Sequence, residues 1–386
     1  APHRSDCEPA MTESDLLGRA NALLPAMVDS VAALVTVESP TEDVESCEEV
    51  VQAAIGVFAG WLPSPARAER HGDRPVWRWG PRRPSVLLLG HLDTVWPRGT
   101  LLRLPFSSDG DRLRGPGVFD MKAGVVQAWA ALALAGVSED SGVGMLLTTD
   151  EETGSHASRT VIADAITDAR AVLVLEPSAD GALKTSRKGT SWYTVGFAGR
   201  AAHAGLDPER GVNALSAAAE FVTACSGWGD PALGTTVTPT TLTAGTTANT
   251  VPAQASLTVD VRAWSFTEQS RVDALVQGWR PTTTQAALTI QGGIDRPAME
   301  SVQSKALFAM AQEAAGHLRL PPLEGRAVGG ASDGNLTAAA GVATLDGLGA
   351  VGDGAHADHE WASVPALAER AALVSALITA LVQSRG

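Results

Sequence analysis

Short apolar runs alternate with longer helical patterns along the first half of the chain. Continuous apolar runs bounded by Gly, Pro or a polar residue are typical of buried strands, and they lie at 85–90, 142–150 and 171–176. Apolar residues spaced three and four apart predict helices at 14–37, 48–62, 121–135 and 155–168. Strands that alternate with helices in this way favour a mostly parallel sheet covered by helices on both faces.

The pattern changes near Thr190. Segments in which β-branched and polar residues alternate predict an antiparallel sheet with one solvated face, at 192–202, 235–247, 255–264 and 286–292. Helical patterns at 211–225 and 265–278 separate them, which gives a β-α-β-β-α-β (ferredoxin-like) order. Helical patterns return at 304–318 and 365–383. We therefore predict an α/β fold in which residues 11–189 and 294–386 form one domain, and an inserted smaller α+β domain spans 190–293.

Charge and cysteine content narrow the functional classes. With 29 basic and 43 acidic residues the formal net charge is −14, so we expect neither nucleic acid nor an anionic membrane as a partner. From the sequence we expect no apolar stretch as long as the roughly 18 residues that a membrane span needs. Cys7, Cys47 and Cys225 are odd in number and far apart, which favours a reducing, cytoplasmic location and excludes a cysteine-based zinc site. The N-terminus lacks the apolar core of a signal peptide, and we expect residues 1–10 to be an extension upstream of a natural start at Met11.

Polar residues follow the predicted parallel strands at the ends where open α/β sheets bind ligands. The run PSVLLL is followed by GHLDTV, which presents His91, and other polar segments lie downstream. The candidate metal ligands in these segments are His91, Asp120, Glu151, Glu152, Glu176 and His356. Two histidines and three carboxylates are the ligand set of a co-catalytic zinc pair bridged by a carboxylate.

Several of these carboxylates have alternative interpretations. Asp93 is too close in sequence to His91 to be an independent ligand and is better suited to fixing the imidazole tautomer. One of Glu151 and Glu152 would bind metal and the other would transfer a proton, but their spacing does not decide which. Glu176 could instead cap a following helix, although an unpaired carboxylate at a buried strand end is costly.

The chain resembles the zinc-dependent family of glutamate carboxypeptidases, aminoacylases, acetylornithine deacetylases and succinyl-diaminopimelate desuccinylases over residues 14–385. Eight motifs occur in the family's order: GHLDTVWPRG, GPGVFDMKAG, TTDEETGSHASR, EPS, GRAAHAG with GVNAL, NTVPAQASLTVDVR, GGASDGN and GAHADHE. The segments EPS, HAGLDPERGVNAL and DRPAM are most similar to the bacterial glutamate carboxypeptidase branch.

The resemblance implies two Zn²⁺ per subunit, with Co²⁺ or Mn²⁺ as alternatives. It implies that Asp120 bridges the metals, that His91 and Glu176 complete one site, and that Glu152 and His356 complete the other. Glu151 then becomes the general base and acid. His359, three residues after His356, competes with it as a ligand, and the spacing to Glu360 favours His356.

The resemblance also implies that the smaller domain is a lid through which the protein forms a homodimer. His203 would reach the partner subunit's site and polarise the scissile carbonyl. The implied substrate contacts are Asn249, Arg262, Arg296, Gly330 and Ser332. Arg262 has an equally good alternative, a salt bridge to Asp260, because its planar guanidinium suits any carboxylate.

The leading hypothesis is therefore a di-zinc amide hydrolase that releases a C-terminal amino acid, glutamate-like because of the two arginines, from an N-acyl amino acid or short peptide. One alternative is a broader N-acyl-amino-acid deacylase similar to aminoacylases or acetylornithine deacetylases. Another is a non-catalytic metal-binding protein of the same fold, against which the extra acid Glu151 argues. A serine hydrolase finds no support, because the sequence has no GxSxG motif.

Overall fold

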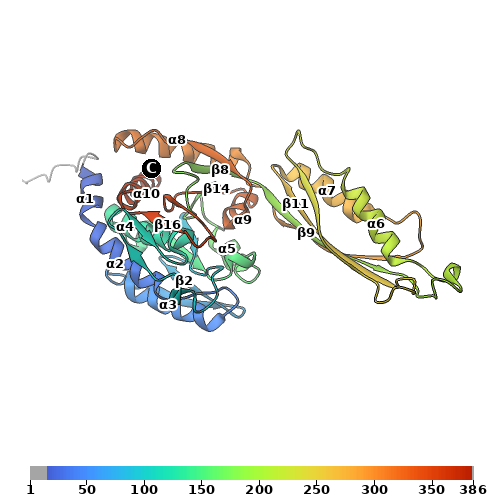
Figure 1. Ribbon diagram of the computed structural model, residues 1–386. Coiled ribbons are helices and arrows are strands. Elements are labelled where there is room, and N and C mark those ends of the chain that lie inside the picture. The colour runs from blue at the N-terminus through green and yellow to red at the C-terminus, as the bar shows by residue number, and fades with distance from the viewer. Residues whose placement is uncertain (1–14, 385–386) are drawn as a thin grey trace, which may run out of the picture. The chain divides into compact units, whose positions relative to one another are not determined.

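The computed structural model describes residues 15–384, and within them the chain divides into two compact units (Figure 1). The first unit contains the residues up to Thr185, Gln303–Arg326 and the residues from Ala340 onward; the second contains Ser186–Val302 and Ala327–Ala339. In sequence, residues of the first unit both precede and follow those of the second. The segment Ala327–Ala339, which the predicted boundaries place with the first domain, groups with the second unit. Cys7, Met11 and the extension at 1–10 lie outside the described residues.

A six-stranded sheet forms the centre of the first unit, in the order β1-β2-β6-β3-β7-β14. Strands β6, β3, β7 and β14 are parallel, whereas β2 runs antiparallel to β6 and pairs with β1 as a hairpin. The bounds are β1 Arg67–His71, β2 Arg74–Trp79, β3 Val86–His91, β6 Val143–Thr148, β7 Ala171–Val174 and β14 Ala343–Leu345. The mostly parallel sheet is thus confirmed, and the three strands predicted from apolar runs are its central strands.

Helices supply the rest of this unit's core. They are α1 Leu16–Ala22, α2 Leu24–Val35, α3 Val44–Phe58, α4 Ala123–Ala135, α5 Arg159–Ala165, α8 Ser301–His317 and α10 Val364–Gln383. The single helix predicted at 14–37 is divided at Leu23, because Pro25 in the first turn of α2 has no N–H to continue a helical ladder. Phe58 of α3 packs edge-on against Trp77 and Trp129, with ring centroids 4.9 and 5.6 Å away.

Two segments of the first unit are long and apolar enough to cross a membrane by composition alone, contrary to the reading of the sequence. They are Val118–Ala135, which includes α4, and Val364–Gln383, which is α10. Their residues are 83% and 67% buried inside the protein, and α4 and α10 pack against each other. Both are therefore core helices of this unit, which explains why they are apolar nearly all round.

Short strands form two further small sheets. Strands β4 Ser107–Ser108, β5 Arg112–Arg114, β15 Gly352–Asp353 and β16 Trp361–Ser363 form a small antiparallel sheet in the order β15-β16-β5-β4. Strand β8 Leu183–Arg187 pairs with β13 Gly325–Val328, and α9 spans Asp333–Ala339.

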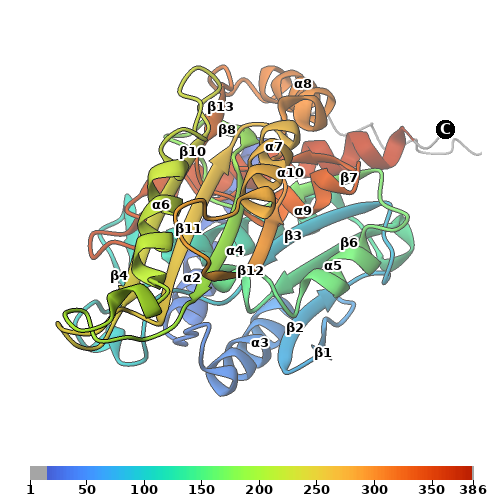
Figure 2. The ribbon, with the colours of Figure 1, turned by 90° about the vertical axis from the view of Figure 1, so that its right-hand side faces the viewer.

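The second unit has the predicted β-α-β-β-α-β order. Its elements are β9 Gly189–Ala198, α6 Ala214–Cys225, β10 Thr236–Ala244, β11 Gln254–Ala263, α7 Phe266–Gly278 and β12 Ala287–Arg296. The strands form an antiparallel sheet in the order β10-β11-β9-β12, and both helices cover one side of it (Figure 2). Alternate residues of β11 are buried beneath these helices, as expected for a sheet with one solvated face.

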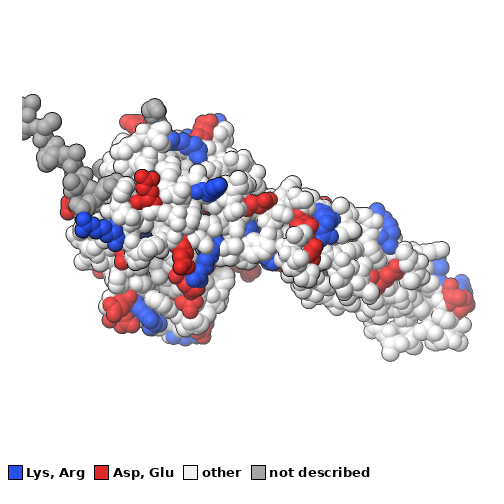
Figure 3. All heavy atoms as spheres, turned by 90° about the horizontal axis from the view of Figure 1, so that it is seen from above, with Lys and Arg blue, Asp and Glu red and all other residues white. Residues whose placement is uncertain are grey.

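Acidic and basic side chains are interspersed on the face of the protein shown in Figure 3.

Candidate metal centre

The ends of three neighbouring parallel strands bring the candidate ligands of the first unit together. Strand β3 ends at His91, β6 leads into a short 3-10 helix at Glu151–Thr153, and β7 is followed two residues later by Glu176. Because β3 pairs with both β6 and β7, these side chains leave the sheet at one edge. This edge is where open α/β sheets bind ligands.

His91 is buried and faces carboxylates. Its Nε2 lies 3.2 Å from Asp120 Oδ1 and 3.6 Å from Glu176 Oε1. Burial opposes the charged imidazolium, but hydrogen bonds with Asp120, Asp93 and Glu176 outweigh it and raise the pKa of His91. With carboxylates on this side of the ring, either a proton or a cation must lie between Nε2 and the oxygens.

Asp93 contacts the other ring nitrogen of His91 through its backbone oxygen and its carboxylate. Nδ1 of His91 lies 3.0 Å from the backbone oxygen of Asp93 and 3.4 Å from its Oδ1, so a proton on Nδ1 leaves Nε2 available as a ligand. The Asp93 side chain is fully buried, and its Oδ2 accepts hydrogen bonds from the Thr41 hydroxyl and the Glu152 backbone N–H. Asp93 therefore connects the histidine to the loop that carries the glutamates.

The Asp120 carboxylate lies between the two histidines. Its Oδ1 faces His91, and its Oδ2 lies 3.4 Å from Nε2 of His356. Burial by itself raises the pKa of Asp120, but the hydrogen bonds to His356 and His91 are stronger and hold that pKa far below its usual range. The side chain is positioned by a short irregular helix, Val118–Lys122, in which Asp120 has non-helical angles and the Asp120–Met121 peptide is cis. Asp120 thus directs one carboxylate oxygen toward each histidine.

His356 and Glu152 form the other side of the cluster. Nε2 of His356 is 3.2 Å from Glu152 Oε2, and its hydrogen bonds with Asp120 and Glu152 raise the pKa of His356 to about 10. Burial raises the pKa of Glu152 to about 7, and its Oε1 is buried without a hydrogen-bond partner among the described residues. His356 and His359 are both exposed, and neither is in the two candidate ligand groups found among the described residues. His356 is distinguished by its contacts with Asp120 and Glu152.

These donors fit divalent metal ions. The ligand atoms of His91, Asp120 and Glu152 lie within 4.8 Å of one another, and so do those of His91, Glu151 and Glu176. Crowded buried carboxylates repel one another unless a cation lies among them. Imidazole and carboxylate ligands suit Zn²⁺, and the same donors also accept Mn²⁺ or Co²⁺. The second group contains Glu151, so both glutamates of the DEE sequence are within reach of a metal.

Two residues of the centre were not predicted from the sequence. Lys184 in β8 places its Nζ 4.0 Å from Glu176 Oε2; its surroundings in the sequence, ALKTSR, carry no signal that separates it from a surface lysine. Glu360, noted only for its spacing from His356, accepts hydrogen bonds from the segment that precedes Asp120. Burial raises the pKa of Glu360, while these backbone donors act in the opposite direction.

The second unit contains the remaining predicted site residues, and His203 is the most informative. Its Nδ1 accepts hydrogen bonds from the backbone N–H groups of Gly205 and Leu206, both 3.1 Å away. A ring nitrogen that accepts cannot carry the proton of a neutral imidazole, so the proton is on Nε2. Asn249 is held nearby, because its backbone oxygen accepts from Ala204 N–H. His203 is exposed and can present Nε2–H as a donor.

The two predicted substrate arginines already have partners within the second unit. Arg262 forms a bidentate pair with Asp260, at 2.9 and 2.8 Å, and stacks over Trp192; this is the salt-bridge alternative considered from the sequence. Arg296 pairs with Asp333 at 3.1 Å, and both are buried.

Gly330 and Ser332 lie on the loop that leads into α9, next to the Arg296–Asp333 pair. The backbone oxygen of Gly330 accepts a hydrogen bond from Arg187, 3.0 Å away. The hydroxyl of buried Ser332 accepts from Gly334 N–H. All five predicted substrate-contact residues are thus held by contacts inside the second unit, Asn249 through its backbone oxygen.

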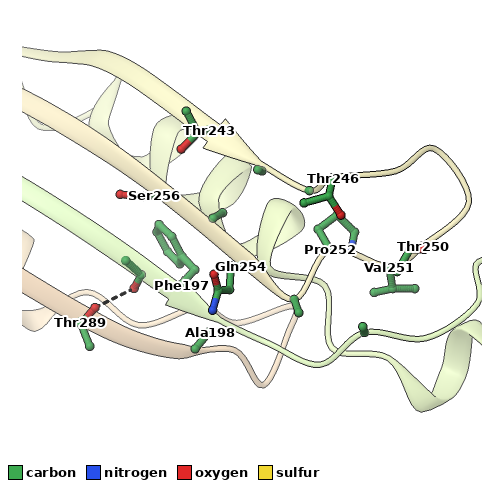
Figure 4. A pocket seen from close by; sticks show the side chains of 16 residues that line it. Phe197, Ala198, Thr243, Thr246, Thr250, Val251, Pro252, Gln254, Ser256 and Thr289 are labelled. Carbon is green, nitrogen blue, oxygen red and sulfur yellow. Dashed lines mark hydrogen bonds between the residues drawn. The ribbon is translucent and has the colours of Figure 1, made fainter.

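A hollow of about 550 Å³ lies at one end of the second unit's sheet (Figure 4). Phe197, Thr250, Gln254 and Thr289 are among its lining residues, and Thr250 forms a bridge with His203. All of its lining residues belong to the second unit, and no predicted metal ligand is among them.

The sequence is similar to those of known peptidases. Residues 87–380 match the model of peptidase family M20/M25/M40. Carboxypeptidase G2 of Pseudomonas sp. (strain RS-16) is 30% identical over 380 residues, which cover 92% of this chain and 89% of that protein. A probable carboxypeptidase of Aspergillus oryzae is 30% identical over 227 residues, which cover 52% of this chain and 51% of that protein.

Solved structures show the same fold. Aminopeptidase PepT from Bacillus cereus superimposes with a TM-score of 0.71 at 19% identity, covering 93% of this chain and 98% of that one. The Bacillus subtilis YXEP protein, described as a dinuclear metal-binding peptidase of the M20 family, has a TM-score of 0.65 at 14% identity, covering 94% and 99% of the two chains.

Proposed function

The chain belongs to peptidase family M20/M25/M40 and is a metal-dependent hydrolase of peptide or amide bonds, and we propose that it is a di-zinc enzyme that releases a glutamate-like C-terminal amino acid from an N-acyl or peptidyl group. The observation that carries this proposal is the placement of Asp120 between His91 and His356. In the proposal, His91 and Glu176 complete one zinc site and Glu152 and His356 complete the other.

The zinc ions, when bound, supply Lewis-acid polarisation of water and of the scissile carbonyl. The residues of the chain then divide the remaining work. Glu151 takes a proton from the attacking water and returns it to the departing amide nitrogen. Asp93 holds the tautomer of His91 through the contacts described above. His203, from the partner subunit of a homodimer, donates Nε2–H to the carbonyl oxygen as negative charge develops there.

The role of Glu151 can be tested against its alternative as a ligand, since its carboxylate is within reach of the His91–Glu176 group. We expect Glu151→Ala to lose turnover and still bind two metal ions, and Glu152→Ala to lose one metal ion. Metal content measured on both folded variants separates the two roles. A Glu151→Ala enzyme that retains substantial activity would show that another group transfers the proton.

Catalysis itself can be separated from simple metal binding. Removal of metal with EDTA should abolish hydrolysis, and added Zn²⁺ should restore it; Co²⁺ and Mn²⁺ in parallel identify the preferred ion. A protein that binds and releases zinc without hydrolysing any N-acyl amino acid would instead be a metal-binding protein of this fold.

The preference for an anionic amino acid is supported by Lys184, a cation beside the metal centre in the first unit. Arg262 and Arg296 are engaged by Asp260 and Asp333, so a substrate carboxylate would share them with these acids. Initial rates on N-acyl-glutamate, N-acyl-leucine and N-acetylornithine test the preference. Faster hydrolysis of the neutral substrate would favour the broader deacylase, and Lys184→Met should raise KM for the glutamate substrate most.

Dimerisation through the second unit can be tested by complementation. Neither Glu151→Ala nor His203→Ala should be active alone, but mixed dimers would contain one site with both residues. Recovery of activity on mixing, together with a dimeric mass in solution, is the expected result. No recovery in demonstrably mixed dimers would show that His203 does not act across subunits. The buried free thiols of Cys47 and Cys225 support the proposed cytoplasmic location.

A further inference from the structure

Glu360 gathers four hydrogen-bond donors onto one buried carboxylate. Its Oε1 accepts from the backbone N–H groups of Phe119 and Asp120, at 2.9 and 3.0 Å. Its Oε2 accepts from Gly117 N–H at 2.9 Å and from the indole N–H of Trp96 at 3.0 Å. Each oxygen thus has two donors and no room for a proton, so Glu360 acts purely as an acceptor.

Three of these donors belong to the segment that presents Asp120. The backbone at Asp120 departs from helical angles, with φ −114° and ψ 91°, so its N–H cannot join a regular helical ladder. A buried N–H without a partner is costly. Glu360 supplies the acceptor and thereby fixes the position and direction of the Asp120 backbone.

The other end of Glu360 is tied to the segment that presents His356. Glu360 N–H donates to Ala357 O, 2.9 Å away, and Ala357 N–H donates to Gly354 O, also at 2.9 Å, which closes a tight loop around His356. The next residue, Trp361, pairs with Arg114 of β5 and with Asp353 of β15. The loop of His356 and the segment leading to Asp120 are therefore held against each other.

We propose that Glu360 is a positioning residue of the metal centre. By accepting hydrogen bonds from the backbone N–H groups of Gly117, Phe119 and Asp120, it sets the separation of Asp120 and His356. The inference rests on the proposed function for the existence of the metal centre. Glu360 contacts the backbone next to Asp120 and His356 and not their side chains. Its replacement should therefore lower the affinity for metal more than it lowers the catalytic rate of the metal-loaded enzyme.

The variant Glu360→Gln tests this with almost no change of shape. Whichever way the glutamine amide is turned, its NH₂ group replaces an oxygen that accepts two hydrogen bonds. Because NH₂ cannot accept, those two hydrogen bonds are lost. We expect the affinity for Zn²⁺ to fall about 10- to 100-fold, the range found when supporting partners of metal ligands are removed. The affinity is measured by competition with a chromophoric chelator on protein whose circular dichroism shows that it is folded.

A matched control is Glu220→Gln in the second unit. Glu220 also accepts four donors, the N–H and hydroxyl groups of Thr282 and Thr283. Glu220 belongs to neither the metal centre nor the predicted substrate contacts, so the zinc affinity of Glu220→Gln should match that of the unmodified protein. Trp96→Phe removes a single donor from Glu360 and should give a smaller loss of zinc affinity than Glu360→Gln.

The outcomes separate cleanly. Unchanged zinc affinity in folded Glu360→Gln, or an equal loss in Glu220→Gln, would overturn the positioning role. If Glu360→Gln does not fold, Trp96→Phe decides, and an affinity equal to that of the unmodified protein would overturn the role. If the unmodified protein binds no zinc at all, the proposed function fails rather than this inference.

Discussion

Substituting Gly124 with alanine should loosen the contact between α4 and the strand end that carries Glu176. Gly124 is the second residue of α4, and a Cβ at this position would lie 2.5 Å from the backbone oxygen of Leu175 and 3.1 Å from Cα of Gly349. Both neighbours are backbone atoms and cannot rotate away. The N–H of Gly349 also donates to Glu176 O, so α4 or the Glu176 segment must move.

The expected magnitude follows from two opposing effects. Replacing a helical glycine with alanine gains up to about 1 kcal/mol of helix propensity. Overpacking a close-packed contact costs about 1–3 kcal/mol, and a clash with backbone belongs at the upper end of that range. We expect a net loss of about 2 kcal/mol in unfolding free energy, or a melting temperature lower by about 4–8 °C.

Gly56 provides the control, because it is also helical, in α3, and a Cβ there meets nothing within 4 Å. Gly56→Ala should be neutral or stabilising by up to about 1 kcal/mol. The assay is thermal unfolding of the metal-free proteins, followed by zinc titration, in which only Gly124→Ala should bind more weakly. A Gly124→Ala protein as stable as Gly56→Ala would refute the close contact on which the reasoning depends.

Two further predictions concern stability. Phe58→Ala removes a fully buried ring that packs against Trp77 and Trp129 and should cost about 3–5 kcal/mol without changing kcat at moderate temperature; a loss below about 1 kcal/mol in denaturant unfolding would contradict this packing. Hydrogen bonds from Thr282 and its neighbour lower the pKa of Glu220 to about 2, so its stabilisation is complete above the ordinary glutamate pKa of 4.5 and declines as the pH falls toward 2. The melting temperatures of the unmodified protein and Glu220→Gln should therefore differ at neutral pH and converge in acid, and a gap that widens in acid would reverse the assigned sign.

The central strands were predictable because strands of a parallel sheet are buried on both faces and form continuous apolar runs. The hairpin of β1 and β2 was missed because both strands, Arg67–His71 at the edge of the sheet and Arg74–Trp79 next to it, carry charged residues that interrupt the apolar pattern. A signal was present, since Gly72 and Asp73 form a two-residue connection that is typical of a hairpin, and Gly72 has the positive φ, 62°, that such a turn needs.

The candidate ligands were predictable from their positions after strands and from the family motifs, and their mutual distances were not. Lys184 was missed because its significance depends on Glu176 being folded next to it. The hydrogen bonds of the Glu360 carboxylate join residues 240–264 positions apart in the chain, which no local pattern can reveal. Arg262 and Asp260 are two apart on one strand and so share a face, which is why the salt bridge could be anticipated.

The sheet of the second unit is built from one continuous stretch of chain, whereas the first unit is built from separate stretches, and this difference affects folding during synthesis. The four strands of the second unit lie within Gly189–Arg296, so this sheet can be completed as soon as that stretch has left the ribosome. The first unit must wait, because α10 at Val364–Gln383 packs against α4 and the two helices share one core. A nascent chain stalled before residue 364 would leave the apolar side chains of α4 that α10 covers exposed to chaperones and proteases.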